Sequence, residues 1–164
     1  MPNPPARATG RSASGGGVGA RQAQPNRQLV LAIQRELAQR GYFPNRPNGR
    51  LGVTTRAAIM AYEVDHQLPI SAHASESVLQ AIILGSTATG ADHREQLSAE
   101  ARELIRLVQH LLKRGGEAEV RKTGTLDTQT RRAIERFQKR NALVPNGRIT
   151  AVLIQRLNEA VRRG

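Results

Sequence analysis

The sequence lacks several residue types on which whole classes of function depend. It contains no cysteine and no tryptophan, so it has no disulfide framework, no zinc ribbon and no thiol chemistry. Its only aromatic residues are Tyr42, Phe43, Tyr62 and Phe137, too few for the stacking platform of a single-stranded nucleic-acid binder. The longest uncharged apolar run, 78–84, is too short to cross a bilayer.

The first 27 residues differ in composition from the rest of the chain. They hold four of the eight prolines, five of the fifteen glycines and four arginines, with no acidic residue. Such a segment cannot bury enough apolar surface to offset the entropy lost on ordering, so we expect 1–27 to be a disordered basic tail or linker. It lacks the apolar region of a secretory signal peptide. The chain is therefore either cytoplasmic or the downstream part of a longer exported or anchored product.

Positive charge dominates, with 25 Lys+Arg against 13 Asp+Glu and a formal net charge of +12. The net charge is +4 over 1–27, +1 over 28–85 and +7 over 86–164. This distribution favours an anionic partner that meets the C-terminal half and the tail. Solvated basic faces are the alternative explanation.

A tandem repeat is the strongest signal in the chain. Shifting the sequence by 75 residues pairs 29–85 with 104–160 without a gap, and 13 of the 57 pairs are identical. The identical pairs are Leu29/Leu104, Gln34/Gln109, Leu37/Leu112, Gly41/Gly116, Arg46/Arg121, Gly49/Gly124, Leu51/Leu126, Thr55/Thr130, Arg56/Arg131, Ala58/Ala133, Ile59/Ile134, Leu68/Leu143 and Gln80/Gln155. Identities in a single register at helical spacing indicate a duplicated structural unit.

Each repeat predicts three short helices with one apolar stripe apiece. The expected helices are 29–40, 53–66 and one starting at Ser75 in the first repeat, and 98–114, 128–141 and one starting at Thr150 in the second. Asp127 is the expected N-cap of 128–141. We therefore predict an all-α fold with a disordered segment 1–27, a first repeat 28–85, a linker 86–97 and a second repeat 98–164. A unit of this size is near the lower limit for an independent core, so packing of the repeats on each other is plausible without being required.

Most of the shared residues have structural explanations. Gly49 and Gly124 are expected to supply a positive φ in the loop before the second helix. Thr55 and Thr130 lie in the first turn of that helix, where a hydroxyl can bond a local backbone group. Tyr62 and its equivalent Phe137 are expected to fill the same core position.

The motifs carry a family resemblance. The second repeat contains Gly-Thr-Leu-Asp-Thr-Gln-Thr at 124–130, Ala-Ile-Glu-Arg-Phe-Gln at 133–138 and Leu-Val-Pro-Asn-Gly-Arg-Ile-Thr at 143–150. In this pattern the chain closely resembles the small three-helix peptidoglycan-binding domain of bacterial cell-wall hydrolases and envelope proteins. The first repeat departs from the pattern at Tyr62-Glu63, where the family prefers Phe-Gln, and at Ser71-Ala72, where an Asn-Gly or Asp-Gly turn is expected.

The resemblance implies non-catalytic binding of peptidoglycan, in the periplasm or cell envelope. It also implies a separate cell-wall hydrolase or envelope protein as a second partner. Because 1–27 offer no export signal, we expect an upstream signal or membrane helix that precedes this chain.

Candidate ligand-binding residues come from the loops and their flanks, since binding groups favour loops on a rigid scaffold. They are Tyr42, Arg46, Arg50 and Arg56 in the first repeat and Arg121, Lys122, Arg131 and Arg148 in the second. If the ligand is peptidoglycan, the cations are expected to pair with stem-peptide carboxylates. For Arg56 and Arg131 the alternative is a solvated helix face. Tyr42 is either a sugar-stacking ring or a lid over the core, and its neighbour Phe43 is expected to be buried.

No catalytic or metal-binding constellation stands out. Asp65, His66 and His73 cluster, but a zinc site needs a further ligand. Paired glycosidase carboxylates, a nucleophile elbow and a phosphate loop are also missing from the sequence. We expect no enzyme activity, no metal and no cofactor.

Two further functions compete with wall binding. Segment 128–141 could be the recognition helix of a nucleic-acid binder. A helix-turn-helix, however, needs a turn of about 3–4 residues, and about a dozen precede this helix, so no nucleic-acid partner is expected. A protein–protein adaptor on the same fold is the other alternative, which the degenerate Ser71-Ala72 turn supports.

Overall fold

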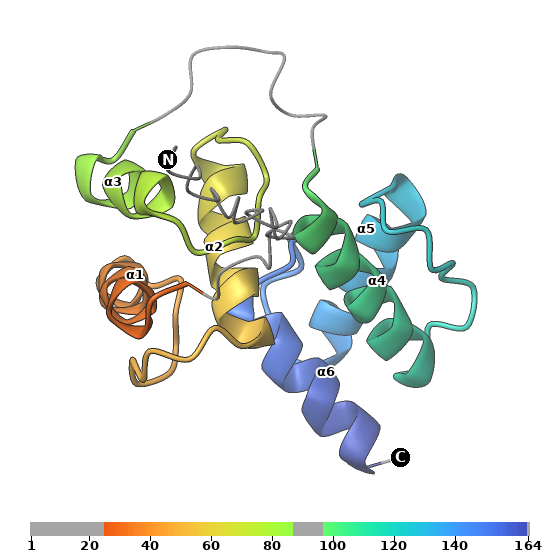
Figure 1. The fold of residues 1–164 in the computed structure, drawn as a ribbon. Helices are drawn as coiled ribbons and strands as arrows, with labels where there is room; N and C mark the ends of the chain where they lie inside the picture. The colour runs from red at the N-terminus through yellow and green to blue at the C-terminus, as the bar shows by residue number, and fades with distance from the viewer. Residues whose placement is uncertain (1–24, 87–96, 164) are drawn as a thin grey trace, which may run out of the picture.

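The computed structural model describes residues 25–86 and 97–163, and within them the chain forms α-helices and no β-strand. The helices are α1 (Arg27–Gln39), α2 (Val53–Asp65), α3 (Glu76–Leu84), α4 (Ala99–Arg114), α5 (Thr128–Arg140) and α6 (Ala151–Arg163). Helices α1–α3 form the first repeat and α4–α6 the second, with α2 and α6 packed together between them (Figure 1). The predicted all-α fold of two tandem three-helix repeats is confirmed.

The ends of the repeats are described only in part. The predicted disorder of the tail, for residues 1–24, and most of the predicted linker 86–97 lie outside the described residues. Helix α1 begins at Arg27, and the side chain of Asn26 accepts a hydrogen bond from the Gln28 amide at 3.0 Å. The last residue of the predicted tail is therefore helical. The remaining domain boundaries stay predictions.

Short polar side chains start the helices where the sequence predicted. Ser75, Asp127 and Thr150 each accept a hydrogen bond from the backbone amide of the third residue after them, at 3.2, 2.7 and 3.2 Å. Ser98 caps α4 in the same way, at 3.0 Å. Each cap satisfies one of the amides that the first helical turn leaves without a partner.

Each repeat has a core along the predicted apolar stripe. The first core includes Val30, Ile33, Leu37, Phe43, Ala58, Ile59, Tyr62, Val78 and Ile82. The second includes Leu104, Ile105, Val108, Leu112, Ala133, Ile134, Phe137, Leu153 and Leu157. Tyr62 and Phe137 are both fully buried, and Phe43 is buried with 5% of its surface exposed. The shared core position and the burial of Phe43 are confirmed.

The two repeats are joined through α2, which is buried on two faces. Ala58 and Ile59 belong to the first core, whereas Ala57 and Met60 of the same helix belong to the second. Ala151 of α6 contributes to the first core in return. The small side chains of Ala57 and Ala151 let the two helices approach closely, and both are completely buried. Two units that are each small for an independent core thus share their apolar surface.

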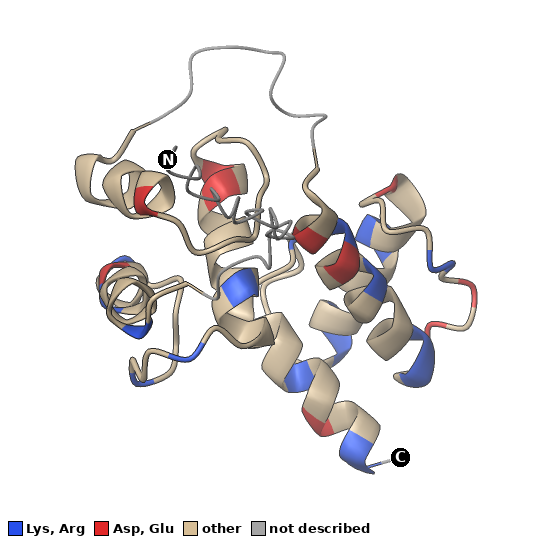
Figure 2. Cartoon of the chain, in the orientation of Figure 1, with Lys and Arg blue, Asp and Glu red and all other residues tan. Residues whose placement is uncertain are grey.

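A difference between the repeats explains why α2, and not α5, faces the other repeat. The residues of α2 on its second face are apolar, and the equivalents on α5 are charged: Ala57/Arg132, Met60/Glu135, Ala61/Arg136 and Val64/Lys139. The four α5 residues are exposed. Helices α2 and α3 carry few charges, while basic residues are spread over α1 and the helices of the second repeat (Figure 2). No helix among the described residues has the length and apolarity to span a membrane.

Candidate ligand-binding site

The predicted cations do not form one cluster. Arg46 and Arg50 are exposed on the loop before α2, and Arg121 and Lys122 are exposed on the equivalent loop before α5. These loops belong to different repeats, and each presents its charge to solvent. They are accessible to an anionic ligand, but each pair stands by itself.

Arg56 and Arg131 are equivalent in sequence and differ in their contacts. Arg56 is half-buried, and its guanidinium donates to the carbonyl of Ala72 at 3.3 Å. Arg131 is exposed, and its Nε donates to the carbonyl of Leu126 at 3.2 Å. Arg56 therefore ties α2 to the turn that follows it, whereas Arg131 ties α5 to the loop that precedes it.

Tyr42, Asp65 and Arg148 form a network that crosses between the repeats. Arg148, in the turn before α6, is ion-paired with Asp65 at the end of α2. The Tyr42 hydroxyl donates to the other carboxylate oxygen of Asp65 at 2.9 Å, and its ring meets that of Tyr62 edge-on. Burial, and then the hydrogen bond to Asp65, raise the pKa of Tyr42 to about 12. Two of the predicted site residues are thus brought together by a carboxylate that the sequence did not assign to the site.

The equivalent positions of the second repeat contact each other with different chemistry. Tyr42 and Asp65 correspond to Glu117 and Arg140, and Arg140 pairs with Glu117 at 2.6 Å. Arg136 donates two hydrogen bonds to the same buried carboxylate. The Glu117–Arg140 pair therefore lies within the second repeat, whereas Asp65 of the first repeat also binds Arg148 of the second.

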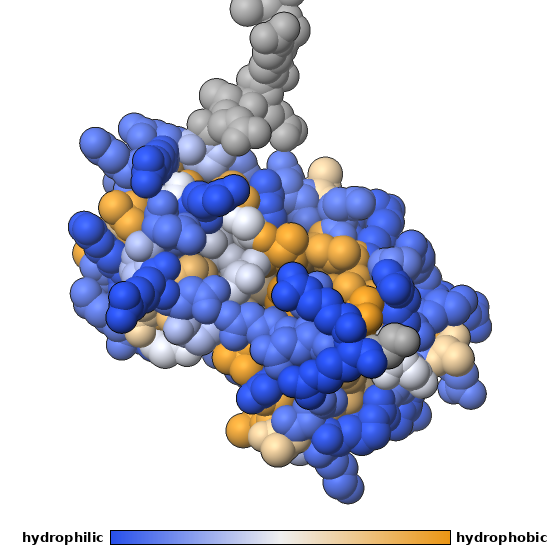
Figure 3. Space-filling view, turned by 90° about the horizontal axis from the view of Figure 1, so that it is seen from below, coloured by the Kyte–Doolittle hydropathy of each residue, from blue (hydrophilic) through white to orange (hydrophobic). Residues whose placement is uncertain are grey.

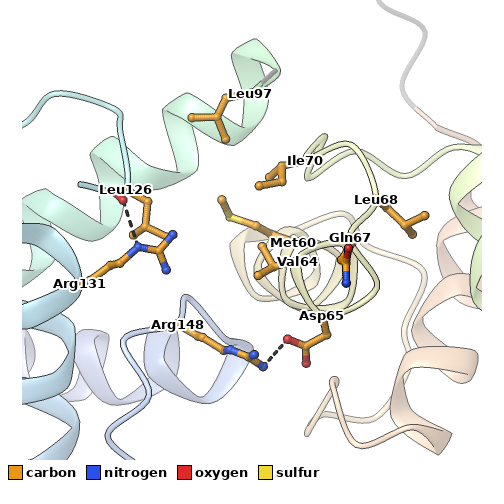
Figure 4. A pocket seen from close by; sticks show the side chains of 10 residues that line it. All are labelled: Met60, Val64, Asp65, Gln67, Leu68, Ile70, Leu97, Leu126, Arg131 and Arg148. Carbon is orange, nitrogen blue, oxygen red and sulfur yellow. Dashed lines mark hydrogen bonds and ion pairs between the residues drawn. The ribbon is translucent and has the colours of Figure 1, made fainter. Parts of the chain in front are cut away.

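Two pockets meet at the Asp65–Arg148 pair. The larger, of about 570 Å³, lies between the repeats and has Arg131 and Arg148 on one side and Met60 and Val64 on the other (Figure 4). The smaller, of about 390 Å³, contains Tyr42, Val144 and Val152. Both pockets are lined by Asp65 and Arg148. Of the eight predicted residues, Tyr42, Arg131 and Arg148 therefore line this junction. The other five line neither of these two pockets.

Two buried glutamines shape the loops that carry the remaining cations. The Oε1 atom of Gln34 accepts from the amides of Asn48 and Gly49 at 2.7 and 2.8 Å, and its Nε2 donates to Thr55 Oγ1 at 2.9 Å. In the second repeat Gln109 accepts from the Gly124 amide at 3.0 Å and donates to Thr130 Oγ1 at 3.0 Å.

These contacts bear on the earlier expectations for the loop. Gly49 and Gly124 have φ of 72° and 75°, as predicted. The Thr55 hydroxyl also donates to the Arg50 carbonyl at 3.2 Å, which confirms its local backbone bond. The role of the glutamines was missed, although the identity of Gln34 and Gln109 at a core-facing position was a visible signal.

A second pair of buried side chains shapes the turns before α3 and α6. Gln138 accepts from the amides of Asn146 and Gly147 at 2.9 and 3.0 Å and donates to Asn146 Oδ1 at 2.9 Å. Glu63, its equivalent, accepts from the amides of Ser71 and Ala72 at 2.9 Å each.

The first repeat departs from the family pattern at Glu63 and at Ser71-Ala72, and these departures compensate each other at this turn. The Ser71 hydroxyl donates to the Glu63 carboxylate, whereas the amide oxygen of Asn146 accepts from Gln138. Ala72 takes a φ of 50°, the left-handed conformation that Gly147 adopts at 67°. Burial raises the pKa of Glu63 to about 7, and its hydrogen bonds to Ser71 and Ala72 oppose that rise.

The histidine cluster is divided among separate contacts. The His66 ring stacks on Tyr62 with a centroid distance of 3.9 Å, and Asp65 is held by Tyr42 and Arg148. His73 Nδ1 is buried and has no hydrogen-bond partner among the described residues. Within the described part of the chain, no three histidine, aspartate or glutamate side chains come together as metal ligands.

A family model agrees with the repeat found in the sequence. The family described as "Putative peptidoglycan binding domain" matches the chain twice, at residues 26–82 and 101–157. The two matches together cover well over half of the chain and contain most of both three-helix units. Neither a curated protein nor a solved structure matched the chain.

Proposed function

The chain belongs to the peptidoglycan binding domain family, and from that premise we propose that it is a non-catalytic module that binds peptidoglycan at the bacterial cell wall. The observation that carries the proposal is that both repeats match the family and that both keep the buried glutamine that shapes the cation-bearing loop. Membership suggests the ligand class, and the charge of the chain suggests which part of that ligand it contacts.

The cations of the loops and the inter-repeat junction suit the peptide part of the polymer. Stem peptides bear free carboxylates, and guanidinium groups recognise carboxylates through paired hydrogen bonds. The exposed cations Arg46, Arg50, Arg121 and Lys122 each contribute roughly 0.2–1 kcal/mol to such contacts. Weak contacts made by two linked repeats along one polymer gain strength through effective concentration. The chain would act outside the inner membrane, in the periplasm or cell envelope, beside a wall hydrolase or envelope protein.

Retention on purified insoluble sacculi tests the proposal. The protein should be retained at low salt and released as the salt concentration rises from about 0.1 to 1 M, where the Debye length shrinks from about 10 to 3 Å. Sacculi from which the stem peptides have been cleaved should retain it less than intact sacculi. DNA-cellulose at matched salt is the control for unspecific charge. Equal or stronger retention on DNA-cellulose would favour a nucleic-acid partner and would contradict wall binding.

The adaptor alternative loses its main support. It drew on the degenerate turn at Ser71-Ala72, which suggested that the protein keeps the fold and has lost the ligand. Glu63 holds that turn in the conformation that Gln138 imposes on the equivalent turn. Failure of the protein to bind sacculi would make the adaptor the better hypothesis.

A further inference from the structure

The pocket between the repeats belongs to neither repeat alone. One side comes from α2 and the segment after it, with Met60, Val64 and Ile70. The other side comes from the second repeat and the residue that leads into α4, with Leu97 and Leu126 (Figure 4). With Leu68, these make six apolar side chains around a space of about 570 Å³. On the face seen in Figure 3, apolar surface likewise gathers in patches bordered by hydrophilic side chains.

Positive charge is in excess at this pocket. Among the described residues that line it, Arg131 and Arg148 are the basic ones and Asp65 is the only acid. Asp65 pairs with Arg148, while Arg131 donates only its Nε to a backbone carbonyl among the contacts of the described residues. The Arg131 Nη groups therefore offer a pair of donors that no other described residue uses.

Asp65 shows that a carboxylate fits beside Arg148. Its own position is fixed from the other side by the Tyr42 hydroxyl at 2.9 Å. The Arg148 side chain remains 44% exposed in the ion pair, and that of Asp65 24%. A second carboxylate can consequently approach the guanidinium of Arg131 and the open side of Arg148 without displacing Asp65 from Tyr42.

We propose that this inter-repeat pocket binds a peptide carboxylate flanked by small apolar side chains, with Arg131 and Arg148 on the carboxylate and Met60, Val64 and Leu126 on the apolar part. The inference rests on the proposed function, because it identifies the peptide as a stem peptide of peptidoglycan. It adds that the two repeats form one shared site, where the repeated sequence alone suggests one site in each.

The lining selects the peptide over the glycan. None of the described residues that line the pocket is aromatic, so this lining offers no flat ring on which a sugar could stack. Its apolar walls instead match alkyl groups, and its polar groups are few, as in sites that orient a small ligand.

The test is a titration of the full ¹⁵N-labelled chain with a soluble stem peptide that carries free carboxylates and no glycan. Backbone amide shifts should concentrate at Met60, Val64 and Leu126, and the same peptide with its carboxylates amidated should not produce them. Arg131→Gln and Arg148→Gln should each weaken binding by about fivefold or more. Arg132→Gln, which removes the same charge from the exposed neighbouring position on α5, should leave binding within about twofold of the wild type.

Arg131→Gln decides the result if Arg148→Gln fails to fold, since Arg148 also supports the contact between the repeats. The shared-site proposal would be wrong if the pocket variants lost no more peptide affinity than Arg132→Gln. It would also be wrong if the backbone amide shifts were confined to the loop of a single repeat. Retention of the wild type on sacculi, measured in parallel, separates the two hypotheses. If the wild type is retained and the pocket variants are retained equally well, the shared site is wrong and wall binding stands. If the wild type is not retained, the proposed function is wrong.

Discussion

Glu63 occupies in the first repeat the position that Gln138 occupies in the second, and each side chain accepts hydrogen bonds from two successive backbone amides of the following turn. The amide Nε2 of Gln138 donates to Asn146, so the acceptor there is a side-chain oxygen. The Glu63 carboxylate has no proton to donate at high pH, and Ser71 donates to it instead. The two turns thus share one geometry, although the hydrogen bond between the buried side chain and the turn side chain runs in opposite directions. Ser71 donates to Glu63, whereas Gln138 donates to Asn146.

The stability of the protein is expected to depend on pH through Glu63. Its pKa is raised from 4.5 to about 7 in the folded protein because the carboxylate is buried, so the folded state binds the proton more tightly than the unfolded state. The contribution to stability is fully present below pH 4.5 and is lost as the pH rises to about 7. The free energy of unfolding should fall by up to about 3 kcal/mol over this range.

Urea denaturation at a series of pH values measures this effect. Glu63→Gln should remove the slope between pH 4.5 and 7, and at pH 8 the variant should be more stable than the wild type. Glu119→Gln, at an exposed position on the loop before α5, is the control and should keep the slope of the wild type. Parallel curves for the wild type and Glu63→Gln would show that Glu63 is not the group responsible.

Gln109 is expected to be a major contributor to the stability of the second repeat. Gln109→Ala should lower the free energy of unfolding by about 2–4 kcal/mol, because it leaves the Gly124 amide and the Thr125 carbonyl without their buried partner. Gln129→Ala, which loses one hydrogen bond at an exposed site to the Glu119 carbonyl, should cost about 1 kcal/mol or less. Chemical denaturation followed by circular dichroism compares the two. Equal losses would contradict the loop-shaping role of Gln109.

The contact between the repeats can be tested by exchanging equivalent residues. Ala57→Arg places in α2 the residue that occupies position 132 in α5, and it forces a charge into a site that is fully buried. We expect a loss of several kcal/mol and a separation of the repeats, visible as an increased radius of gyration in small-angle X-ray scattering. The reverse change, Arg132→Ala, lies on an exposed face and should alter stability by about 0.5 kcal/mol or less. A compact, fully stable Ala57→Arg protein would rule out the packing of α2 on α6.

The ionisation of Tyr42 reports on Asp65. Its pKa of about 12 reflects burial and the hydrogen bond and negative charge of Asp65, so Asp65→Asn should move the pKa towards the ordinary value of 10.0 without fully restoring it. The chain has two tyrosines and no tryptophan, and in a Tyr62→Phe background the alkaline absorbance change comes from Tyr42 alone. Glu36→Gln, on α1, is the control and should leave the Tyr42 pKa unchanged. No change on Asp65→Asn would contradict the hydrogen bond.

Much of the fold follows from local sequence. The caps Ser75, Asp127 and Thr150 act on amides three residues away, and apolar residues at helical spacing define each core stripe. These features involve neighbours along the chain, so composition and periodicity suffice to predict them. The repeat extends the same reasoning from one unit to the other, as the shared burial of Tyr62 and Phe137 illustrates.

The sequence by itself determined two three-helix units and the loops that bear their cations. Only the tertiary structure decided which of those cations meet. Arg131 and Arg148 line one pocket with Asp65 because α2 packs on α6, and Asp65 lies more than eighty positions before Arg148 in the chain. A contact over that separation leaves no periodic pattern in either segment. It depends on the packing of Ala57 and Met60 into the second core, where shape and burial, rather than local propensity, set the geometry.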